Sequence, residues 1–227
     1  MKIAVLEEIL QENDAVAEGN RRLFSEYGVY ALNLMSSPGS GKTSMIERTL
    51  EKLGGDIRVG IVEGDIETTR DAERLERLGV PVVQILTRSE CHLDARMISC
   101  ALKDIDLSEL DAVIIENVGN LVCPAEFRVG EDHKAVILSV AEGEDKPLKY
   151  PLMFRESSAL LLNKVDLIPH APFDLNRARE YALQINPHLE IFEVSSLTGQ
   201  GIDEWVAWFR RCVEEAKRKR HGRVTSR

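Results

Sequence analysis

The segment Ser36–Thr43, with the sequence SSPGSGKT, constrains this chain more than any other feature. An apolar run precedes it over residues 30–35, and a helix-compatible stretch follows from Ser44 to Leu53. Strand, glycine-rich loop and helix in this order are the context of a phosphate-binding loop. Such a loop directs backbone N–H groups at phosphate oxygens, and the positive end of the helix adds to the attraction. The segment therefore predicts a nucleotide-binding α/β fold.

Single residues of this loop have expected roles. The Lys42 amine is expected to reach the β- and γ-phosphates, and the Thr43 hydroxyl to hold Mg²⁺. The usual first glycine of the pattern is replaced by Ser36, although the glycine at 39 still lets the backbone turn tightly. A chance glycine-rich turn is the alternative, and the later motifs disfavour it. The predicted contacts to the nucleotide phosphates come from Gly39, Ser40, Gly41, Lys42, Thr43 and Ser44.

Apolar strands and helices alternate along the rest of the chain. Strands are expected at 57–62, 80–85, 112–115, 135–140, 159–162 and 190–194, and helices at 68–78, 91–102, 175–184 and 202–220. Strands that are apolar on both faces and separated by helices indicate a mostly parallel central sheet flanked by helices. Residues 4–25 show helical spacing ahead of this sheet, and Asn13-Asp14 could divide them into two helices.

Two acidic residues follow predicted strands, which is where nucleotide sites lie in open α/β sheets. Asp65 and Glu116 could each bind Mg²⁺ directly or through water. The Gly119 N–H is placed to meet the γ-phosphate and to couple its loop to the nucleotide state. For either carboxylate alone, a helix cap or a solvated loop residue is the alternative. The predicted catalytic residues are Lys42, Asp65, Glu116 and Gly119, and Thr43, Asp65 and Glu116 are the predicted magnesium ligands.

The motif Asn163-Lys164-Val165-Asp166 indicates that the base is guanine. A carboxylate at Asp166 can accept from the guanine N1–H and exocyclic amine, a pair of donors that adenine does not offer. Asn163 is expected to hold the loop and the base, with the Lys164 stem along the purine. Ser195, Ser196 and Leu197 follow the next strand, where a loop could close over the guanine O6. Behind a phosphate-binding loop, this motif predicts a P-loop GTPase.

Hydrolysis of GTP is expected to be slow, because no glutamine stands beside Gly119 to position the attacking water. Assistance by the Asp65 carboxylate is the alternative.

Cysteine and histidine residues near the last of these loops form a candidate second metal site. Cys91 and His92 begin the helix predicted at 91–102, and Cys123 lies four residues after Gly119. Thiolate and imidazole ligands suit Zn²⁺ and Ni²⁺ rather than Mg²⁺, and a helix N-terminus lowers a thiol pKa. A two-fold dimer could double this incomplete set of three ligands. From these residues alone, small buried cysteines and an ordinary polar histidine are the favoured interpretation.

Composition limits the remaining choices. The net charge of −9 argues against a general nucleic-acid binder, and no apolar run is long enough to cross a membrane. Residues 1–8 contain charges and do not resemble a signal peptide, so we expect a cytoplasmic protein. Its cysteines are then thiols or metal ligands, with Cys100 and Cys212 expected as core thiols. The predicted organisation is an N-terminal helical extension at 1–28, a P-loop GTPase domain at 29–216 and a basic tail at 217–227.

Together these motifs resemble the HypB family of GTPases, which assist nickel insertion into [NiFe]-hydrogenase. The resemblance implies a P-loop fold of the SIMIBI class, which includes signal-recognition and MinD-type NTPases. It also implies a GTP-linked homodimer with a nickel or zinc site at its interface, and it makes Cys91, His92 and Cys123 the expected ligands of that metal. The stretches that carry it are 37–43, Glu63–Asp65, Cys91–Ala95, Glu116–Pro124, Glu142–Pro151 and Asn163–Asp166.

The same resemblance implies partners and one more contact. A HypA-type nickel chaperone is the implied partner, and a hydrogenase large-subunit precursor is the implied client. Lys146 is expected to reach the nucleotide, within the chain or across the dimer. No cysteine motif or histidine-rich tract precedes Ser36, so a high-affinity nickel storage role is not expected.

Three alternatives stay open at this point. The first is a urease-type nickel-insertion GTPase, which the separation of the Cys91-His92 pair from Cys123 disfavours. The second is a GTP-binding metal scaffold with little turnover. The third is a P-loop kinase or ligase, which the guanine motif at Asn163–Asp166 disfavours.

Overall fold

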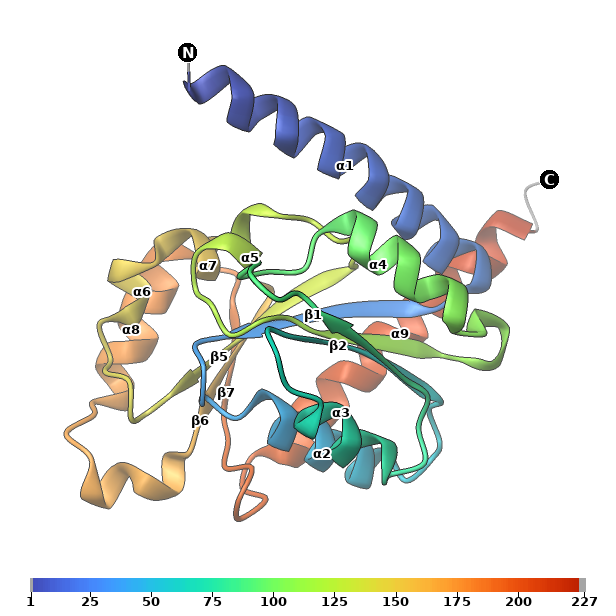
Figure 1. Cartoon of the computed structure of the whole chain (residues 1–227). Coiled ribbons are helices and arrows are strands. Elements are labelled where there is room, and N and C mark those ends of the chain that lie inside the picture. The colour runs from blue at the N-terminus through green and yellow to red at the C-terminus, as the bar shows by residue number, and fades with distance from the viewer. Residues whose placement is uncertain (1, 225–227) are drawn as a thin grey trace.

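A parallel β-sheet runs through the centre of the molecule, with the strand order β3-β2-β4-β1-β5-β6-β7 (Figure 1). The computed structural model describes the backbone of residues 2–224 and the side chains of residues 7–219. Because the paired strands are all parallel, the predicted mostly parallel sheet is confirmed. Its strands are β1 Tyr30–Ser36, β2 Val59–Asp65, β3 Val82–Leu86, β4 Ala112–Glu116, β5 His133–Ser139, β6 Ala159–Asn163 and β7 Glu190–Glu193.

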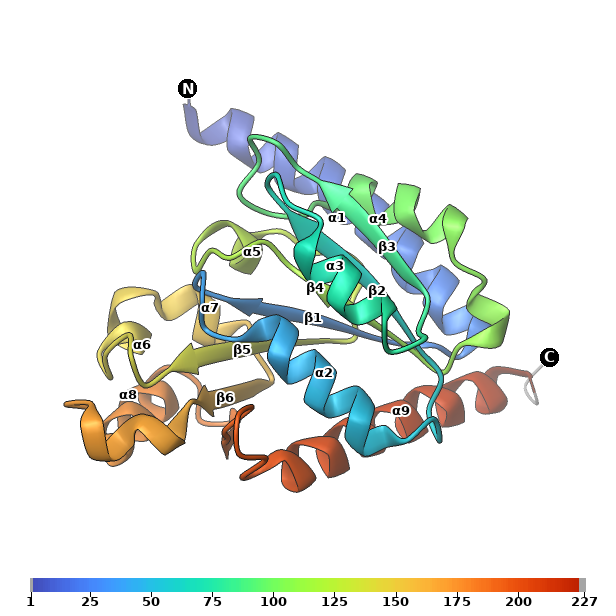
Figure 2. The ribbon, with the colours of Figure 1, turned by 60° about the horizontal axis from the view of Figure 1, so that its bottom comes forward.

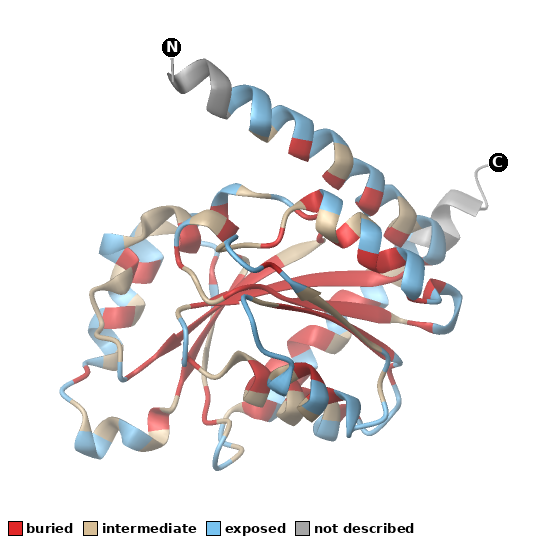
Figure 3. Cartoon of the chain, viewed as in Figure 1, coloured by how far each residue is buried: buried red, intermediate tan, exposed pale blue. Residues whose placement is uncertain are grey.

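Helices cover both faces of the sheet, so its central strands are buried (Figure 3). On one face α2 and α9 pack together beneath the strands, with α3 beside them (Figure 2). The other face carries α1 and α4 over one half and α5, α7 and α8 over the other. The helices are α1 Lys2–Tyr27, α2 Lys42–Leu53, α3 Arg70–Glu76, α4 Ala95–Ala101, α5 Cys123–Glu126, α6 Lys146–Lys149, α7 Pro151–Arg155, α8 Leu175–Ile185 and α9 Ile202–Val224, with 3-10 turns at Leu102–Asp104, Leu107–Glu109 and Val165–His170.

The sheet order brings four loops to one edge. Because all the strands are parallel, the loops that leave β1, β4, β5 and β6 start from their adjacent carboxyl ends. These loops begin at Ser36, Glu116, Ser139 and Asn163. Crevices at this edge are where α/β sheets bind ligands, so the topology assembles a site from segments far apart in the sequence.

The helices differ from the prediction in three main ways. Helix α1 runs unbroken through Asn13, because that side chain bonds to other segments and does not interrupt its own helix. Helix α4 begins at Ala95, after an Asp94 N-cap that accepts from Met97 N, so Cys91 and His92 precede the helix and do not begin it. Helix α9, predicted at 202–220, continues to Val224. Side chains of the predicted basic tail beyond residue 219 lie outside the described residues.

Candidate functional site

The phosphate-binding loop connects the buried end of β1 to the first residue of α2. Gly41 precedes the helix with φ +100°, a conformation that side-chain-bearing residues rarely adopt. A Cβ there would also lie 2.6 Å from Asn163 Nδ2. Lys42 Nζ donates to Ser36 Oγ at 3.3 Å, and Ser36 Oγ donates to Ser37 O at 2.6 Å. The serine that replaces the usual first glycine thus holds the lysine beside the loop.

Thr43 and Glu116 meet under this loop in an arrangement that fits a divalent cation. Thr43 Oγ1 donates to Glu116 Oε1 at 2.8 Å. Glu116 is buried, and its Oε2 has no hydrogen-bond partner among the described residues. Burial raises the pKa of this carboxyl to about 7. A buried carboxylate oxygen without a partner is costly unless a cation or a donor satisfies it, and a hydroxyl and a carboxylate are ligands that Mg²⁺ accepts.

Asp65, the last residue of β2, is occupied mainly by its own turn. Its Oδ1 accepts from the backbone N–H groups of Glu67 and Thr68, at 2.8 and 2.7 Å. Carboxylate oxygens of Glu63, Asp65 and Asp71 all lie within 4.8 Å of one another. The structure therefore brings Asp65 into an acidic group beside the phosphate loop.

The sequence reasoning missed Glu63, which neighbours Glu116 across the sheet. The two residues are in register on β2 and β4, and both are buried. Burial, with the charge of Glu116, raises the pKa of Glu63 to about 8. Glu63 Oε2 also has no partner among the described residues. Its place in an otherwise apolar strand was the available signal.

Two residues of α3 were also missed, although they line the phosphate pocket. This pocket has a volume of about 190 Å³ and includes Asp71 and Arg74 together with Lys42, Thr43 and Glu116. Arg74 donates to Ser44 Oγ at 3.2 Å and to Glu47 Oε2 at 2.6 Å, and it pairs with Asp71 at 3.1 Å. Nothing in the spacing of α3 indicated which of its charges would face the loop.

Glu142 is a further contact of the phosphate loop. Its Oε1 accepts from Ser40 Oγ at 2.6 Å and from Ser139 N at 3.0 Å. It follows β5 at the edge of the sheet that carries the other loops, and that position could have identified it. The predicted Lys146 lies four residues further on, with its Nζ 5.5 Å from the centre of the Tyr150 ring. It is not among the described residues that line the phosphate pocket.

The guanine motif is joined directly to the phosphate loop. Asn163 Nδ2 donates to Ser40 O at 2.9 Å, and Lys164 Nζ donates to Gly39 O at 2.8 Å. Asn163 Oδ1 accepts from Ser196 N at 3.2 Å, which brings in the loop after β7. The structure therefore joins the predicted base residues Asn163 and Lys164 to the phosphate loop by hydrogen bonds.

The far side of the guanine motif is held by the same loop. Asp166 Oδ1 accepts from Ser195 Oγ at 2.5 Å, whereas Leu197 is exposed. Arg48 of α2 donates to the carbonyls of Ser196 and Leu197, so this loop is also attached to the helix that follows the phosphate loop.

The loop after β4 rests on the phosphate loop. A Cβ on Gly119 would lie 2.9 Å from Pro38 Cα and 3.0 Å from Pro38 N, so only glycine allows this approach. Asn117, just before it, is buried and accepts from Leu93 N and Val118 N, each at 3.0 Å. Its Nδ2 donates to Asn33 Oδ1 of β1 at 3.1 Å.

The same loop carries Cys123 to the two other candidate metal ligands. The Sγ atoms of Cys91 and Cys123 are 3.0 Å apart, and Cys91 Sγ is 3.9 Å from His92 Nδ1. One ligand atom from each of the three residues fits within 4.8 Å. The His92 ring packs on Phe127, with ring centres 4.0 Å apart. Burial lowers the pKa of His92, which keeps the imidazole neutral as a ligand must be. The donor set fits Ni²⁺ or Zn²⁺.

Two predictions about the cysteines are wrong. Cys91 does not begin a helix, because it precedes Asp94, the N-cap of α4. For Cys123, burial and the neighbouring Cys91 thiol raise the pKa to about 11. Cys100 is exposed on α4 and is not a core thiol, because it lies on the outer side of a helix only seven residues long. Cys212 is buried as predicted.

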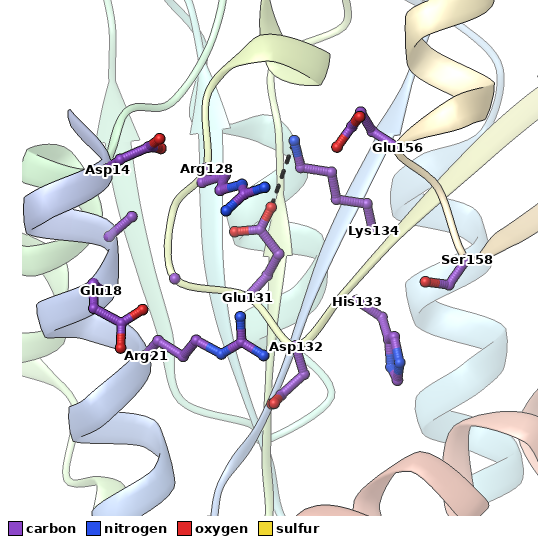
Figure 4. Close-up of a pocket in the computed structure, with 12 residues that line it drawn as sticks. Asp14, Glu18, Arg21, Arg128, Glu131, Asp132, His133, Lys134, Glu156 and Ser158 are labelled. Carbon is purple, nitrogen blue, oxygen red and sulfur yellow. Dashed lines mark ion pairs between the residues drawn. The ribbon is translucent and has the colours of Figure 1, made fainter. Parts of the chain in front are cut away.

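The segment after Cys123 is fastened by a buried lysine. Lys134 Nζ donates to Pro124 O at 3.2 Å and to Ala125 O at 2.8 Å, and it pairs with Glu131 at 3.7 Å (Figure 4). Burial lowers the pKa of Lys134. These bonds satisfy carbonyl groups that the four-residue helix α5 leaves without a helical partner.

Comparison with known proteins identifies the family to which this arrangement belongs. The CobW/HypB/UreG nucleotide-binding domain family matches residues 30–193. The hydrogenase maturation factor HypB of Azotobacter vinelandii is 50% identical over 209 residues, which cover 92% of this chain and 69% of that protein. This chain belongs to the HypB family.

Solved structures agree with this assignment. HypB from Helicobacter pylori in complex with nickel has a TM-score of 0.86 and 38% identity, over 90% of this chain and 96% of that one. HypB from Archaeoglobus fulgidus has a TM-score of 0.84 and 41% identity, over 89% and 99% of the two chains. The predicted resemblance to HypB is confirmed, and the chain is a hydrogenase maturation factor with a nucleotide-binding domain. Among its described helices, none combines the length and apolar character that crossing a membrane requires.

Proposed function

We propose that this HypB-family protein is a GTP-hydrolysing metallochaperone that assists nickel insertion into [NiFe]-hydrogenase. One observation carries the proposal. A single loop of six residues, 117–122, leads from Glu116, which accepts from Thr43 of the phosphate loop, to Cys123, which lies 3.0 Å from Cys91. Gly119, between them, touches Pro38. A change in the γ-phosphate region would therefore reach a metal ligand through one short connection.

The nucleotide is GTP in this proposal. Asp166 would accept from the guanine N1–H and exocyclic amine, Asn163 would hold the base loop against the phosphate loop, and Lys164 would lie along the purine. Ser195, Ser196 and Leu197 would close the site around the base. The bond from Asn163 to Ser40 O supports a base site that is continuous with the phosphate site.

The phosphate groups would be held by the backbone of Gly39–Ser44 and by the Lys42 amine. Mg²⁺, held by Thr43 and Glu116 and reached by Asp65 through water, would neutralise charge on the β- and γ-phosphates. Asp65 would orient the attacking water, and the Gly119 N–H would contact the γ-phosphate. No glutamine stands beside Gly119, so turnover is slow.

The transferred metal would bind at Cys91, His92 and Cys123. Nickel is the proposed cargo, and zinc fits the same donors. Three ligands from one chain leave the set incomplete, so a second copy of the chain would complete it at a two-fold interface. GTP binding would assemble this dimer, and Lys146 would reach the nucleotide across it. Hydrolysis, or contact with a HypA-type partner or the hydrogenase large-subunit precursor, would release the metal in the cytoplasm.

The proposal is tested by nickel and zinc titration with light scattering, in GDP and in a non-hydrolysable GTP analogue. We expect the analogue to give a dimer that binds metal through Cys123, and Cys123→Ala to abolish this binding. Cys100→Ser is the matched control, because that thiol is exposed and lies outside the site. Metal binding and dimerisation that are both indifferent to nucleotide would contradict the coupling.

A second candidate is a GTP-binding metal scaffold with little turnover. Multiple-turnover phosphate release from GTP, abolished by Lys42→Ala, separates the enzyme from the scaffold. Release at the level of the Lys42→Ala variant would favour the scaffold.

A further inference from the structure

We propose that Asn13 and Asn20 of α1 are positioning residues for the metal-binding side chains, an inference that rests on the proposed metal site. These asparagines are buried although they lie on a helix that precedes the nucleotide-binding domain. They are seven residues apart, which is two helical turns, so both face the same side of α1. Each one bonds to the two chain segments that carry the candidate metal ligands.

The first segment is held at Ala95, three residues after His92. Ala95 N donates to Asn13 Oδ1 at 2.9 Å, and Ala95 O accepts from Asn20 Nδ2 at 2.8 Å. Ala95 is the first residue of α4, where a backbone N–H has no partner within the helix. Asn13 therefore supplies from another helix the acceptor that this N–H requires.

The second segment is held just beyond Phe127. Asn13 Nδ2 donates to Arg128 O at 2.8 Å, and Asn20 Nδ2 donates to Val129 O at 3.0 Å. The next residue, Gly130, approaches α1 so closely that a Cβ there would lie 2.9 Å from Ala17 O. A polar cavity of about 170 Å³ adjoins this contact between α1 and residues 128–134 (Figure 4).

These bonds close a circuit of contacts beside the candidate metal site, which the circuit meets at His92. Asn13 bonds to Ala95, three residues after His92, and the His92 imidazole packs on Phe127. The residue after Phe127 is Arg128, whose carbonyl bonds back to Asn13. The orientation of each asparagine side-chain amide is fixed by these bonds, because only its oxygen can accept from the Ala95 N–H and only its NH₂ group can donate to the carbonyl groups. Helix α1 thereby fixes the separation of the Cys91–His92 segment from the Cys123 segment, and metal affinity depends on it.

The test is nickel titration of the full chain with Asn20→Leu and Asn13→Asp. Asn20→Leu removes the bonds to both segments, and we expect nickel binding to weaken about tenfold, the equivalent of one lost hydrogen bond. Asn13→Asp keeps an acceptor for Ala95 N but turns a carboxylate oxygen toward Arg128 O in a buried place, so we expect nickel binding to weaken at least as much. The thiolate-to-nickel absorption band is expected to shift in both variants, while GDP affinity stays at the wild-type value.

Asn186→Leu is the matched control, because Asn186 also bonds to backbone carbonyls, those of Phe154 and Ser157, in another part of the molecule. We expect it to lower the melting temperature and to leave nickel binding unchanged. Folded Asn20→Leu and Asn13→Asp variants with wild-type nickel affinity and absorption would overturn the inference, as would equal weakening by Asn186→Leu. If Cys123→Ala, made without any substitution in α1, leaves nickel binding intact, the proposed metal site fails, and the inference fails with it.

Discussion

Asn117 accepts a hydrogen bond from the backbone N–H of Leu93 at 3.0 Å, which joins the residue after Glu116 to the residue after His92. The same side chain donates to Asn33 Oδ1 in β1, the strand that leads into the phosphate loop. A buried amide thus connects β1, the end of β4 and the segment that carries Cys91 and His92.

We expect Asn117→Ala to reduce the difference in nickel affinity between the GDP and GTP-analogue states. The substitution leaves the Leu93 N–H and Asn33 Oδ1 without this partner, at a cost of about 1–3 kcal/mol in the free energy of unfolding. Nickel titration in both nucleotide states and urea unfolding measure the two effects. Thr49→Val, which removes the buried bond from Trp205 Nε1, is the control for lost stability alone. Unchanged nucleotide dependence in Asn117→Ala would argue against this connection.

The stability of the nucleotide-free, metal-free protein is expected to fall as pH rises from 6 to 9. Burial raises the pKa of Glu116 to about 7 and of Glu63 to about 8, against an ordinary 4.5. The folded protein therefore keeps these protons to higher pH than the unfolded chain. The resulting stabilisation is complete below pH 4.5 and is lost as pH rises through 7 and 8.

Calorimetric melting in a chelating buffer measures this dependence. Glu63→Gln keeps the shape of the side chain without its ionisation. Between pH 7 and 9 the melting temperature of this variant should therefore fall by about 4 °C less than that of the wild type, or by a still smaller amount. Parallel pH profiles for the wild type and Glu63→Gln would show that Glu63 does not titrate in this range.

Asp166→Asn is expected to change the preferred nucleotide from GTP to xanthosine triphosphate. An asparagine amide can donate to the xanthine O2, whereas it loses the paired acceptors that guanine requires. We expect GTP binding to weaken about 100-fold, because the carboxylate makes two charge-assisted hydrogen bonds to guanine and the amide cannot make the same pair. Competition binding of the two nucleotides to one variant gives the result without a correction for protein stability. Loss of both nucleotides together would indicate a structural effect through Ser195, which donates to Asp166.

Two glycine-to-alanine substitutions should have opposite effects on stability. Gly119→Ala places a Cβ 2.9 Å from the Pro38 backbone, and we expect a loss of about 1–3 kcal/mol together with weaker GTP-analogue binding. Gly19 lies inside α1 with nothing within 4 Å of its added Cβ, so Gly19→Ala should stabilise by about 0.5–1 kcal/mol. Urea unfolding and nucleotide titration measure both. Normal nucleotide binding by Gly119→Ala would show that the contact of this loop with Pro38 does not contribute to nucleotide binding.

The fold could be predicted, and residues for a nucleotide site could be proposed, because their signals are local. A glycine-rich loop after an apolar strand, or an acidic residue at a strand end, is visible in a few neighbouring letters. Contacts between distant segments are not visible in this way. Arg74 and Ser44 meet across two helices, and Asn20 meets Val129 over 109 positions of sequence.

The errors in the predicted helices have the same origin. Asparagine is unfavourable inside a helix, so Asn13-Asp14 could divide residues 4–25, yet the Asn13 amide is satisfied by other segments and α1 continues. The helix predicted at 91–102 includes Cys91, whereas Asp94 is the N-cap of α4. The pKa of Cys123 is raised by burial and by the neighbouring Cys91 thiol.

The length of the loop from Glu116 to Cys123 also limits the distance between the two sites. The seven Cα-to-Cα steps from Glu116 to Cys123 reach at most about 25 Å when fully extended, and here Gly119 lies against Pro38 partway along. One inserted residue would add slack without altering any ligand, and one deleted residue would pull the thiol away from Cys91. Loop length is thus a quantity that natural variation or design can adjust independently of either binding site.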